Sequence, residues 1–353
     1  MEDFIVSYGI GICGVGMISN FQAKAIQEVE NAELIGFVSR TEENVRGAGE
    51  EFGVNWTTNY DEFLALDGLD VVSICTPSGA HLEYAIRAAE AGKHVIVEKP
   101  LEVTLERCDA TIAACRKAGV KLGVIFPSRF LDSSAIVKKA LDEGRFGRLS
   151  LGDAYVKWWR SQEYYDEGGW KGTKELDGGG ALMNQSIHAI DLLQWFMGDV
   201  EAITGFTAVL AHERIEVEDT AVATLRFKNG ALGVIEGTTS VHPGFFKKLE
   251  ISGNGGSVVL QEADILAWEF ADARAEDEKI LEEFGAKTKT GGGASDPAAI
   301  SHEGHRRQFV DFLDALDNDR EPHVNGEEGR KAVEIILAIY QANETGQVVT
   351  LPL

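Results

Sequence analysis

Short apolar runs alternate with amphipathic segments along the first 126 residues of the chain. The apolar runs predict strands, and the segments between them, in which apolar residues recur every three or four positions, predict helices. Strands that alternate with helices form a parallel sheet with right-handed crossovers. We therefore predict a doubly wound α/β domain over residues 1–126, with strands at 5–13, 33–39, 70–75, 93–97 and 121–126 and helices at 17–29, 42–51, 79–91 and 104–118.

The pattern changes after residue 150, where alternation between apolar and polar positions becomes the main signal. Residues 220–240 hold two alternating segments around Asn229-Gly230, a dipeptide typical of two-residue β-hairpin loops. Alternation at 200–209 and 246–260 predicts further antiparallel strands. Residues 127–353 are therefore predicted to form an α+β domain with a large, mostly antiparallel sheet.

Three helices accompany these strands. One is predicted at 181–197, and two at 302–317 and 327–345 close the chain, where they can pack back on the first domain. Before them, residues 271–300 are charged, then rich in glycine, with little periodicity. This segment is either a flexible excursion or a substrate lid.

Composition narrows the class of protein. A length of 353 residues favours two domains, and no stretch approaches the ~18 consecutive apolar residues of a membrane helix. The net charge of −24 argues against nucleic acid and anionic membranes as partners, because both bind basic surfaces. Four cysteines without zinc-type spacing, and a start without a basic region before its apolar run, predict a cytoplasmic protein with free thiols.

Candidate chemistry begins at the first turn of the first domain. The sequence YGIGICGVGMIS places Gly14 and Gly16 directly after the first predicted strand and Ser19 in the opening of the first helix. Gly14 permits a tight turn, and Gly16 lets backbone amides approach a pyrophosphate at the helix N-terminus. Ser19 stands where a third glycine is usual, a position that needs only a small residue. The turn predicts a dinucleotide cofactor (NAD or NADP), bound also by Met17 and Ile18.

The end of the second predicted strand bears on which dinucleotide is bound. An Asp there would bond the ribose hydroxyls and repel a 2′-phosphate, but the chain has Ser39 and Arg40. A hydroxyl and a guanidinium suit a phosphate, so this pair slightly favours NADP over NAD. Alternatively, Arg40 stacks on the adenine ring.

Two further strand ends meet the same edge of the parallel sheet, where ligands bind. Thr76 and Pro77 follow the third predicted strand and are expected to line the cofactor. His81 either contacts the cofactor or is a satisfied residue at a helix start. The fourth strand ends at Glu98-Lys99, which directs Lys99 toward the expected nicotinamide and leaves Glu98 to anchor the turn beside the cofactor.

The second domain offers a polar face on an otherwise apolar helix. Three glycines at 178–180 open the helix predicted at 181–197. On that helix Asn184, His188 and Asp191 fall at i, i+4 and i+7, so they share one face. A lone histidine would normally belong to the core, but a polar trio on one face favours a role in catalysis.

An aromatic and cationic segment, VKWWRSQEYYDEGGWKGT at 156–173, precedes that helix. Its rings either stack on the apolar face of a sugar or pack on the sheet, and its cations can hold hydroxyls or a carboxylate. The substrate residues predicted here are Arg160, Tyr164, Trp170 and Lys171, and Trp170 is assigned to the cofactor as well. SHEGH at 301–305 lacks zinc-type spacing, so no metal is predicted.

In these motifs the chain resembles the glucose–fructose oxidoreductase/inositol dehydrogenase family (Gfo/Idh/MocA). The resemblance covers nearly the whole length and rests on GVGMIS, TPSGAH, EKP, the glycine-led helix and HRRQFVDFLDAL near the end. It implies an NAD(P)-dependent dehydrogenase or reductase of sugars or polyols, often a homodimer or homotetramer joined through the sheets of the second domain. It also implies that Lys99 contacts the substrate and assists proton transfer, that His188 is the general acid/base, and that the Lys99–Pro100 bond is often cis.

One position departs from the family pattern. Many members carry Asp where this chain has Asn184, and an amide cannot share a proton. The proton relay then rests on His188 and Lys99, while Asn184 exchanges a hydrogen bond with a substrate hydroxyl.

Hydride transfer between nicotinamide and a hydroxyl-bearing carbon of a sugar, glycoside or polyol is thus the leading prediction. Two alternatives stay open. One is a glycosidase with tightly held NAD, which shares this fold and which release of sugar from an aryl glycoside without added cofactor would identify. The other is a non-catalytic nucleotide or sugar sensor, although the presence of both Lys99 and His188 counts against it.

Overall fold

The computed structural model describes residues 7–167, 169–287 and 301–353. The chain divides into two compact units, which are residues 1–127 with 301–330, and residues 128–300 with 331–353. None of the helices in the described ranges is long and apolar enough to cross a membrane.

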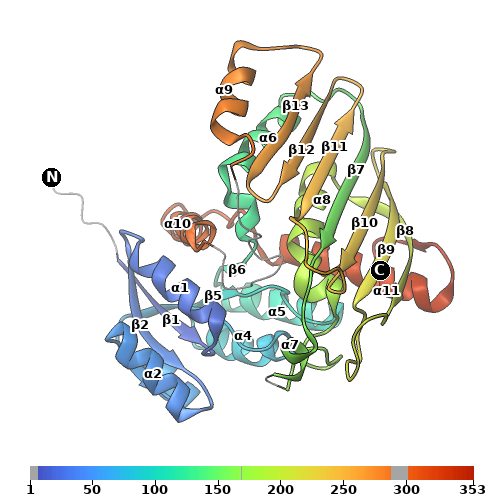
Figure 1. Ribbon diagram of the computed structural model, residues 1–353. Coiled ribbons are helices and arrows are strands. Elements are labelled where there is room, and N and C mark those ends of the chain that lie inside the picture. The colour runs from blue at the N-terminus through green and yellow to red at the C-terminus, as the bar shows by residue number, and fades with distance from the viewer. Residues whose placement is uncertain (1–6, 168, 288–300) are drawn as a thin grey trace. The chain divides into compact units, whose positions relative to one another are not determined.

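The first unit is built on a six-stranded sheet in the order β3-β2-β1-β4-β5-β6, with every neighbouring pair parallel. Of these strands, β1, β2, β5 and β6 are labelled in Figure 1. This order reverses direction at β1 and β4, as in doubly wound folds, and confirms the predicted fold class. All five predicted strands are present; β3 was not predicted, because three residues without an apolar run give no pattern. The strands are β1 (Tyr8–Cys13), β2 (Ala32–Val38), β3 (Asn55–Thr57), β4 (Leu69–Ile74), β5 (His94–Val97) and β6 (Leu122–Val124).

The predicted crossover helices are also present, together with a short α3 that the pattern did not indicate. A helix from far along the chain completes this unit: in α10 (Glu303–Asp317), Phe309, Phe312 and Leu313 recur on one face and are fully buried. They join the cluster that contains Ile26 and Val29, so α10 packs beside α1. The other helices are α1 (Met17–Gln27), α2 (Glu42–Phe52), α3 (Tyr60–Leu64), α4 (His81–Glu90) and α5 (Leu105–Ala118).

The second unit is built on an eight-stranded sheet in the order β13-β12-β11-β7-β10-β9-β8-β14. Only β10 and β7 pair in parallel, so the predicted mostly antiparallel sheet is confirmed. The hairpin predicted at Asn229-Gly230 joins β9 to β10. The strands are β7 (Leu149–Lys157), β8 (Val200–Ala208), β9 (Thr220–Phe227), β10 (Leu232–Thr238), β11 (Lys248–Gly253), β12 (Gly256–Gln261), β13 (Asp264–Phe270) and β14 (Val349–Thr350).

Helices pack against this sheet. The helix α8 (Ile187–Met197) packs so closely on β7 that a Cβ added at Gly152 would lie 2.6 Å from Met197 Cγ. The charged part of the predicted excursion forms α9 (Ala275–Phe284), whereas its glycine-rich part, 288–300, lies outside the described residues. The remaining helices are α6 (Asp132–Asp142), α7 (Gln162–Asp166) and α11 (Gly326–Thr345).

The helix predicted at 181–197 begins differently from the expectation. Residues Ala181–Ser186 form a π-helical turn, and the α-helix proper starts at Ile187. Ser186 Oγ donates to the carbonyl oxygen of Ala181 at 2.7 Å, a contact five residues back that suits the wider turn. Such turns often occur at functional sites.

Candidate active site

The glycine turn between β1 and α1 has the geometry of a dinucleotide loop. Gly14 has φ +100°, and a Cβ added there would lie 2.7 Å from the carbonyl carbon of Cys75, so only glycine fits. Gly16 is exposed, and a Cβ added there meets no described atom within 4 Å. The packing of the protein itself therefore does not require a glycine at position 16. A ligand that approaches the backbone closely would explain why a glycine stands there.

Ser19 closes this turn from inside the helix. Its buried Oγ accepts from the Gly16 amide at 2.9 Å and donates to the Gly16 carbonyl at 2.8 Å. The Gly16 amide is thus already used, and the amides that follow, at Met17 and Ile18, belong to the first helical turn and have no carbonyl one turn earlier to bond. These amides and the helix N-terminus suit a pyrophosphate.

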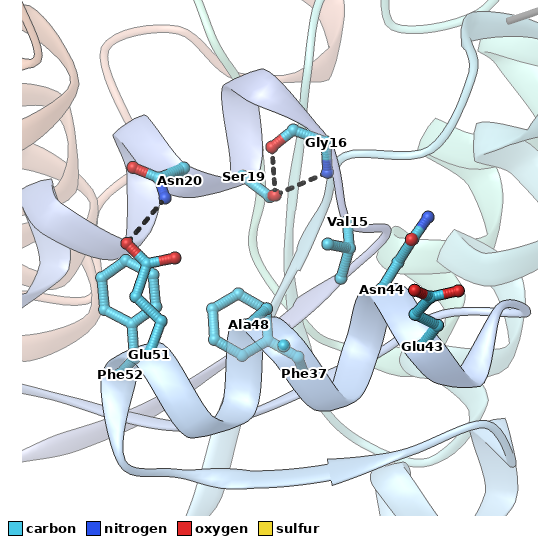
Figure 2. Close-up of a pocket in the computed structure, with 11 residues that line it drawn as sticks. Val15, Gly16, Ser19, Asn20, Phe37, Glu43, Asn44, Ala48, Glu51 and Phe52 are labelled. Carbon is cyan, nitrogen blue, oxygen red and sulfur yellow. Dashed lines mark hydrogen bonds between the residues drawn. The ribbon is translucent and has the colours of Figure 1, made fainter.

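A cavity of about 340 Å³ lies beside the turn, between α1 and α2 (Figure 2). Gly16 and Phe37 form part of its wall. Glu43 and Glu51 bring carboxylates to it, and Asn20 Nδ2 donates to Glu51 at 3.3 Å. Because carboxylates repel phosphate, this cavity does not suit the pyrophosphate, and the N-terminus of α1 remains the better candidate.

At the carboxyl end of β4, Thr76 carries a buried hydroxyl group that points to a ligand. Its Oγ1 is buried and has no hydrogen-bond partner among the described residues, which fits a ligand that bonds it from the sheet edge. His81, one turn on, is buried instead of lying at the surface, with Nδ1 2.9 Å from the Pro100 carbonyl and Nε2 3.0 Å from the Thr76 carbonyl. The ring therefore ties the Thr76-Pro77 segment to the turn after β5.

Lys99 stands on that turn, half-buried, and the Lys99–Pro100 peptide is cis, as the resemblance implies. The buried carboxylate of Glu98 accepts the Lys99 amide at 3.1 Å and Gln22 Nε2 at 2.6 Å, and His305 Nε2 lies 3.7 Å away. Burial alone would raise the pKa of Glu98, but His305, the Lys99 charge and Gln22 together lower it. An ionised Glu98 thus anchors the Lys99 turn to α1 and α10.

At the end of β2, Ser39 is half-buried and Arg40 is exposed. Burial raises the pKa of Tyr84, and the charge of Arg40 opposes that rise, which places Arg40 near this ring. The first turn of α2 follows at once and carries Glu42 and Glu43. The surroundings of Arg40 are therefore not uniformly positive.

In the second unit, Asn184 and His188 stand out from their helix. From Ala181 to Leu193 every residue is buried except these two, which are half-exposed. Asp191, placed on the same face by the sequence, is buried and held by Arg129, whose Nε and Nη2 donate at 2.8 and 2.6 Å. The exposed part of the predicted face is thus Asn184 with His188, while Asp191 serves the interior.

Three of the predicted substrate residues of the 156–173 segment, Arg160, Tyr164 and Lys171, meet beside this face. Gln185 joins them: its Oε1 accepts from Arg160 Nη2 at 2.8 Å, and its Nε2 donates to Tyr164 Oη at 3.0 Å. Lys171 Nζ lies 4.0 Å from the centre of the Tyr164 ring. Burial lowers the pKa of Lys171, although nearby carboxylates oppose this shift.

Other aromatic residues of the segment divide between the two predicted roles. Trp158 and Tyr165 are buried and pack in the interior, whereas Tyr164 and Trp170 are half-exposed. Two residues that the sequence analysis missed are central to this cluster. One is Gln185; the other is Asp177, whose Oδ1 accepts from Asn184 Nδ2 at 2.6 Å. Its place directly before the three glycines was the available signal.

His302 and His305, in the SHEGH segment, each lie near a carboxylate. His302 Nε2 is 3.0 Å from Glu28 Oε1, and His305 faces Glu98. Within the part of the chain that the structure describes, no group of three or more His, Cys, Asp or Glu side chains could hold a metal ion.

A doubly wound nucleotide unit with an open glycine turn, joined to a sheet unit with a half-exposed Asn–His face, defines a nicotinamide-dependent oxidoreductase. Residues 8–126 match the oxidoreductase family with an NAD-binding Rossmann fold, and residues 135–259 match the GFO/IDH/MocA C-terminal domain. The chain belongs to the GFO/IDH/MocA family, so the predicted family and the predicted enzyme class, hydride transfer with a nicotinamide cofactor, are confirmed.

Relatives match over nearly the whole length. The WlbA dehydrogenase from Bordetella pertussis, solved with NADH and UDP-GlcNAcA, is 34% identical, with a TM-score of 0.87 over 98% of this chain and 99% of that one. Myo-inositol 2-dehydrogenase of Thermotoga maritima is 28% identical over 97% of this chain and 98% of its own. A levoglucosan dehydrogenase solved with NADH and levoglucosan is 25% identical, with a TM-score of 0.85 over 98% and 100%.

Proposed function

We propose that this protein is a dehydrogenase of sugars that carry a carboxylate, with a nucleotide-linked hexuronic acid as the leading candidate. The observation that carries the proposal is the grouping of Arg160 and Lys171 beside the half-exposed Asn184–His188 face. Guanidinium and ammonium groups suit a carboxylate better than a neutral polyol. The similarity to a dehydrogenase solved with UDP-GlcNAcA supports the same class.

The reaction divides between cofactor and protein. The nicotinamide, when bound, exchanges the hydride. We assign the hydroxyl proton to His188 as general acid/base, because it is the half-exposed titratable group of its helix. Lys99, whose backbone amide is bonded by the ionised Glu98, is assigned to orient the hydroxyl and ease its deprotonation. Asn184 is assigned to form a hydrogen bond with a substrate hydroxyl. Lys99 lies in the first unit and His188 in the second.

For the cofactor we propose NAD. The guanidinium of Arg40 favours NADP on the sequence, but Glu42 and Glu43 follow it within one turn and would repel a 2′-phosphate. Two of the relatives described above were solved with NADH, which supports the same choice. Arg40 is then assigned to stack on adenine, with Ser39 at the ribose.

The open face of the second sheet supports a homo-oligomer, as a dimer or a tetramer. Phe206 is 81% exposed and pairs across the strands with Val222, while Leu232 and Leu151 pair on the same face. Exposed apolar side chains gathered on one face of a sheet are typical of an interface between subunits. Size-exclusion chromatography with light scattering would test this, and Phe206→Glu should yield monomers.

We also propose a cytoplasmic location. The thiols of Cys13, Cys75, Cys108 and Cys115 are free, which supports this location.

The test is a screen of NAD and NADP against UDP-linked and free hexuronic acids, levoglucosan, and myo- and scyllo-inositol, with nicotinamide absorbance as the signal. His188→Ala should lower turnover roughly 100-fold or more while NADH binding stays intact, the usual scale for lost general acid–base catalysis. Lys99→Ala should do comparable harm. Near-normal turnover in folded His188→Ala protein would contradict the assignment, and a preference for inositols would contradict the substrate class.

A further inference from the structure

Asp177 and Asn184 form a partly buried hydrogen bond to which the proposed mechanism gives no role. Asp177 is 1% exposed and stands at the turn before the glycines that open the π-helical turn. Its Oδ1 accepts from Asn184 Nδ2 at 2.6 Å, and its Oδ2 accepts from the Gly172 amide at 2.8 Å. A carboxylate this deep is retained only when it is bonded to donors.

This pair decides which way the amide of Asn184 points. An ionised carboxylate can only accept hydrogen bonds, so the NH₂ group of Asn184 must face Asp177. The amide oxygen then points away from Asp177, and there Gln185 Nε2 donates to it at 3.2 Å. Asn184 thus presents a hydrogen-bond acceptor, which can receive a substrate hydroxyl proton but cannot donate to a carbonyl.

The charge of Asp177 also reaches the neighbouring substrate residues. Burial raises the pKa of Tyr164, and the negative charge of Asp177 raises it further. For Lys171, burial lowers the pKa, whereas Glu167 and Asp177 oppose the loss of its proton. Asp177 is therefore a buried carboxylate that bonds Asn184 and whose charge acts on Tyr164 and Lys171.

We propose that Asp177 is a positioning residue for the reaction: its carboxylate locks Asn184 as an acceptor for a substrate hydroxyl and is the buried counter-charge of Lys171. This inference rests on the proposed function, because it names the residue that sets the orientation of a substrate contact. It predicts that one carboxylate and one amide are required at positions 177 and 184, and that either arrangement of the two can work.

The exchanged arrangement keeps the three hydrogen bonds named above, from Gly172, between positions 177 and 184, and from Gln185. With Asp177→Asn and Asn184→Asp together, the amide at 177 accepts the Gly172 proton through its oxygen and donates to the carboxylate at 184. That carboxylate still accepts from Gln185 and still offers an acceptor to the substrate. Asn184→Asp alone instead brings two carboxylates together at about 2.6 Å, where they must share a proton.

The experiment compares wild type, Asp177→Asn, Asn184→Asp and the exchanged double variant, with KM, kcat and their pH profiles as readouts. Asp177→Asn should raise KM roughly tenfold or more, with a smaller change in kcat, because the amide at 184 loses its fixed orientation. Asn184→Asp should lose activity as pH rises through neutrality. The double variant should recover KM to within about threefold of wild type and lose that pH dependence.

A matched control is Asp264→Asn. Asp264, on β13, is another buried carboxylate of the same unit, and it accepts a hydrogen bond from the Lys287 amide. Its kinetics should equal those of wild type. Unchanged KM in Asp177→Asn, or a double variant no better than Asn184→Asp, with melting temperatures showing folded protein, would overturn the inference. Failure of the proposed function would show separately, as undiminished turnover in His188→Ala.

Discussion

Two glycine-rich turns each lead into a helix, and they treat its N-terminus in opposite ways. At Gly14–Gly16 the helix start is open: Gly16 is exposed and a Cβ added there meets no described atom. At Gly178–Gly180 the helix start is filled. Glu218 accepts the amides of Gly180 and Leu182 through its carboxylate, at 3.0 and 2.8 Å, and the amide of Ala181 through its carbonyl, at 2.9 Å.

The comparison shows that a glycine-rich helix start is not by itself an anion site. The first turn leaves amides and a helix dipole for a ligand. The second satisfies its amides with an internal carboxylate, which Tyr340 also contacts at 3.0 Å, so that the turn can position Asn184 and His188. Glycine is needed there for close packing, because a Cβ at Gly180 would overlap the carbonyl oxygen of Glu218.

The largest expected effect is therefore at the filled turn. Gly180→Ala would force a Cβ against the Glu218 backbone, which cannot move as a flexible side chain can. We expect a loss of about 3 kcal/mol or more in the free energy of unfolding, measured by urea denaturation. A variant as stable as wild type would contradict the close contact between Gly180 and the Glu218 backbone.

The carboxylate that fills this turn should make stability depend on pH. Burial raises the pKa of Glu218 to about 7, although bonds from Leu182, Gly180 and Tyr340 oppose the shift. Because the folded pKa lies above the ordinary value, the contribution of Glu218 is complete below pH 4.5 and is lost as pH rises through 7.

The matched variant is Glu218→Gln, which cannot ionise. The unfolding free energy of wild type relative to this variant should fall by at most about 3 kcal/mol between pH 4.5 and pH 8. Denaturation of both proteins at the two pH values, with the difference taken at each, removes the contribution of all other groups. A difference that is constant with pH would mean that Glu218 is ionised throughout.

At the open turn the effect should be on binding and not on stability. Gly16→Ala should leave the melting temperature within about 1 °C but weaken NADH binding roughly tenfold, because the new methyl occupies space left for the pyrophosphate. Fluorescence titration with NADH measures this. Gly47→Ala is the control: it too adds a Cβ that meets no described atom within 4 Å, and NADH affinity should not change.

The smallest effect concerns the adenosine end. If NAD is the cofactor and Arg40 stacks on adenine, Arg40→Ala should weaken NAD and NADP alike, by roughly two- to fivefold. Arg46→Ala, which removes another exposed guanidinium from α2, should change neither. A loss confined to NADP would restore the preference that the sequence suggested.

Much of the fold followed from pattern, because burial imposes periodicity. The five strands of the first sheet, its crossover helices and the hairpin at Asn229-Gly230 all carry such a signal. Segments that bury little carry none: β3 has three residues, and α9 has no buried residue at all among those described. Both were missed for that reason.

The site was predictable as a set of residues but not as a network. Asn184 and His188 share a face by spacing alone, and they are the half-exposed residues between Ala181 and Leu193. The residues that hold these two side chains in place lie elsewhere in the sequence. Asp177 accepts from Asn184 across the glycine turn, and Glu218, which accepts the Leu182 amide, lies 36 residues beyond it. No periodicity links positions that meet only after the chain has folded back.

The packing of α10 beside α1 has a consequence for how this protein is made. The nucleotide-binding unit takes residues 301–330 as well as 1–127, and its core holds Phe309 and Phe312 of α10. A ribosome that has delivered the six parallel strands has therefore not yet delivered a complete domain. Until the last part of the chain emerges, the α1 surface around Ile26 stays uncovered, so this unit should mature late in synthesis although its sheet lies near the N-terminus.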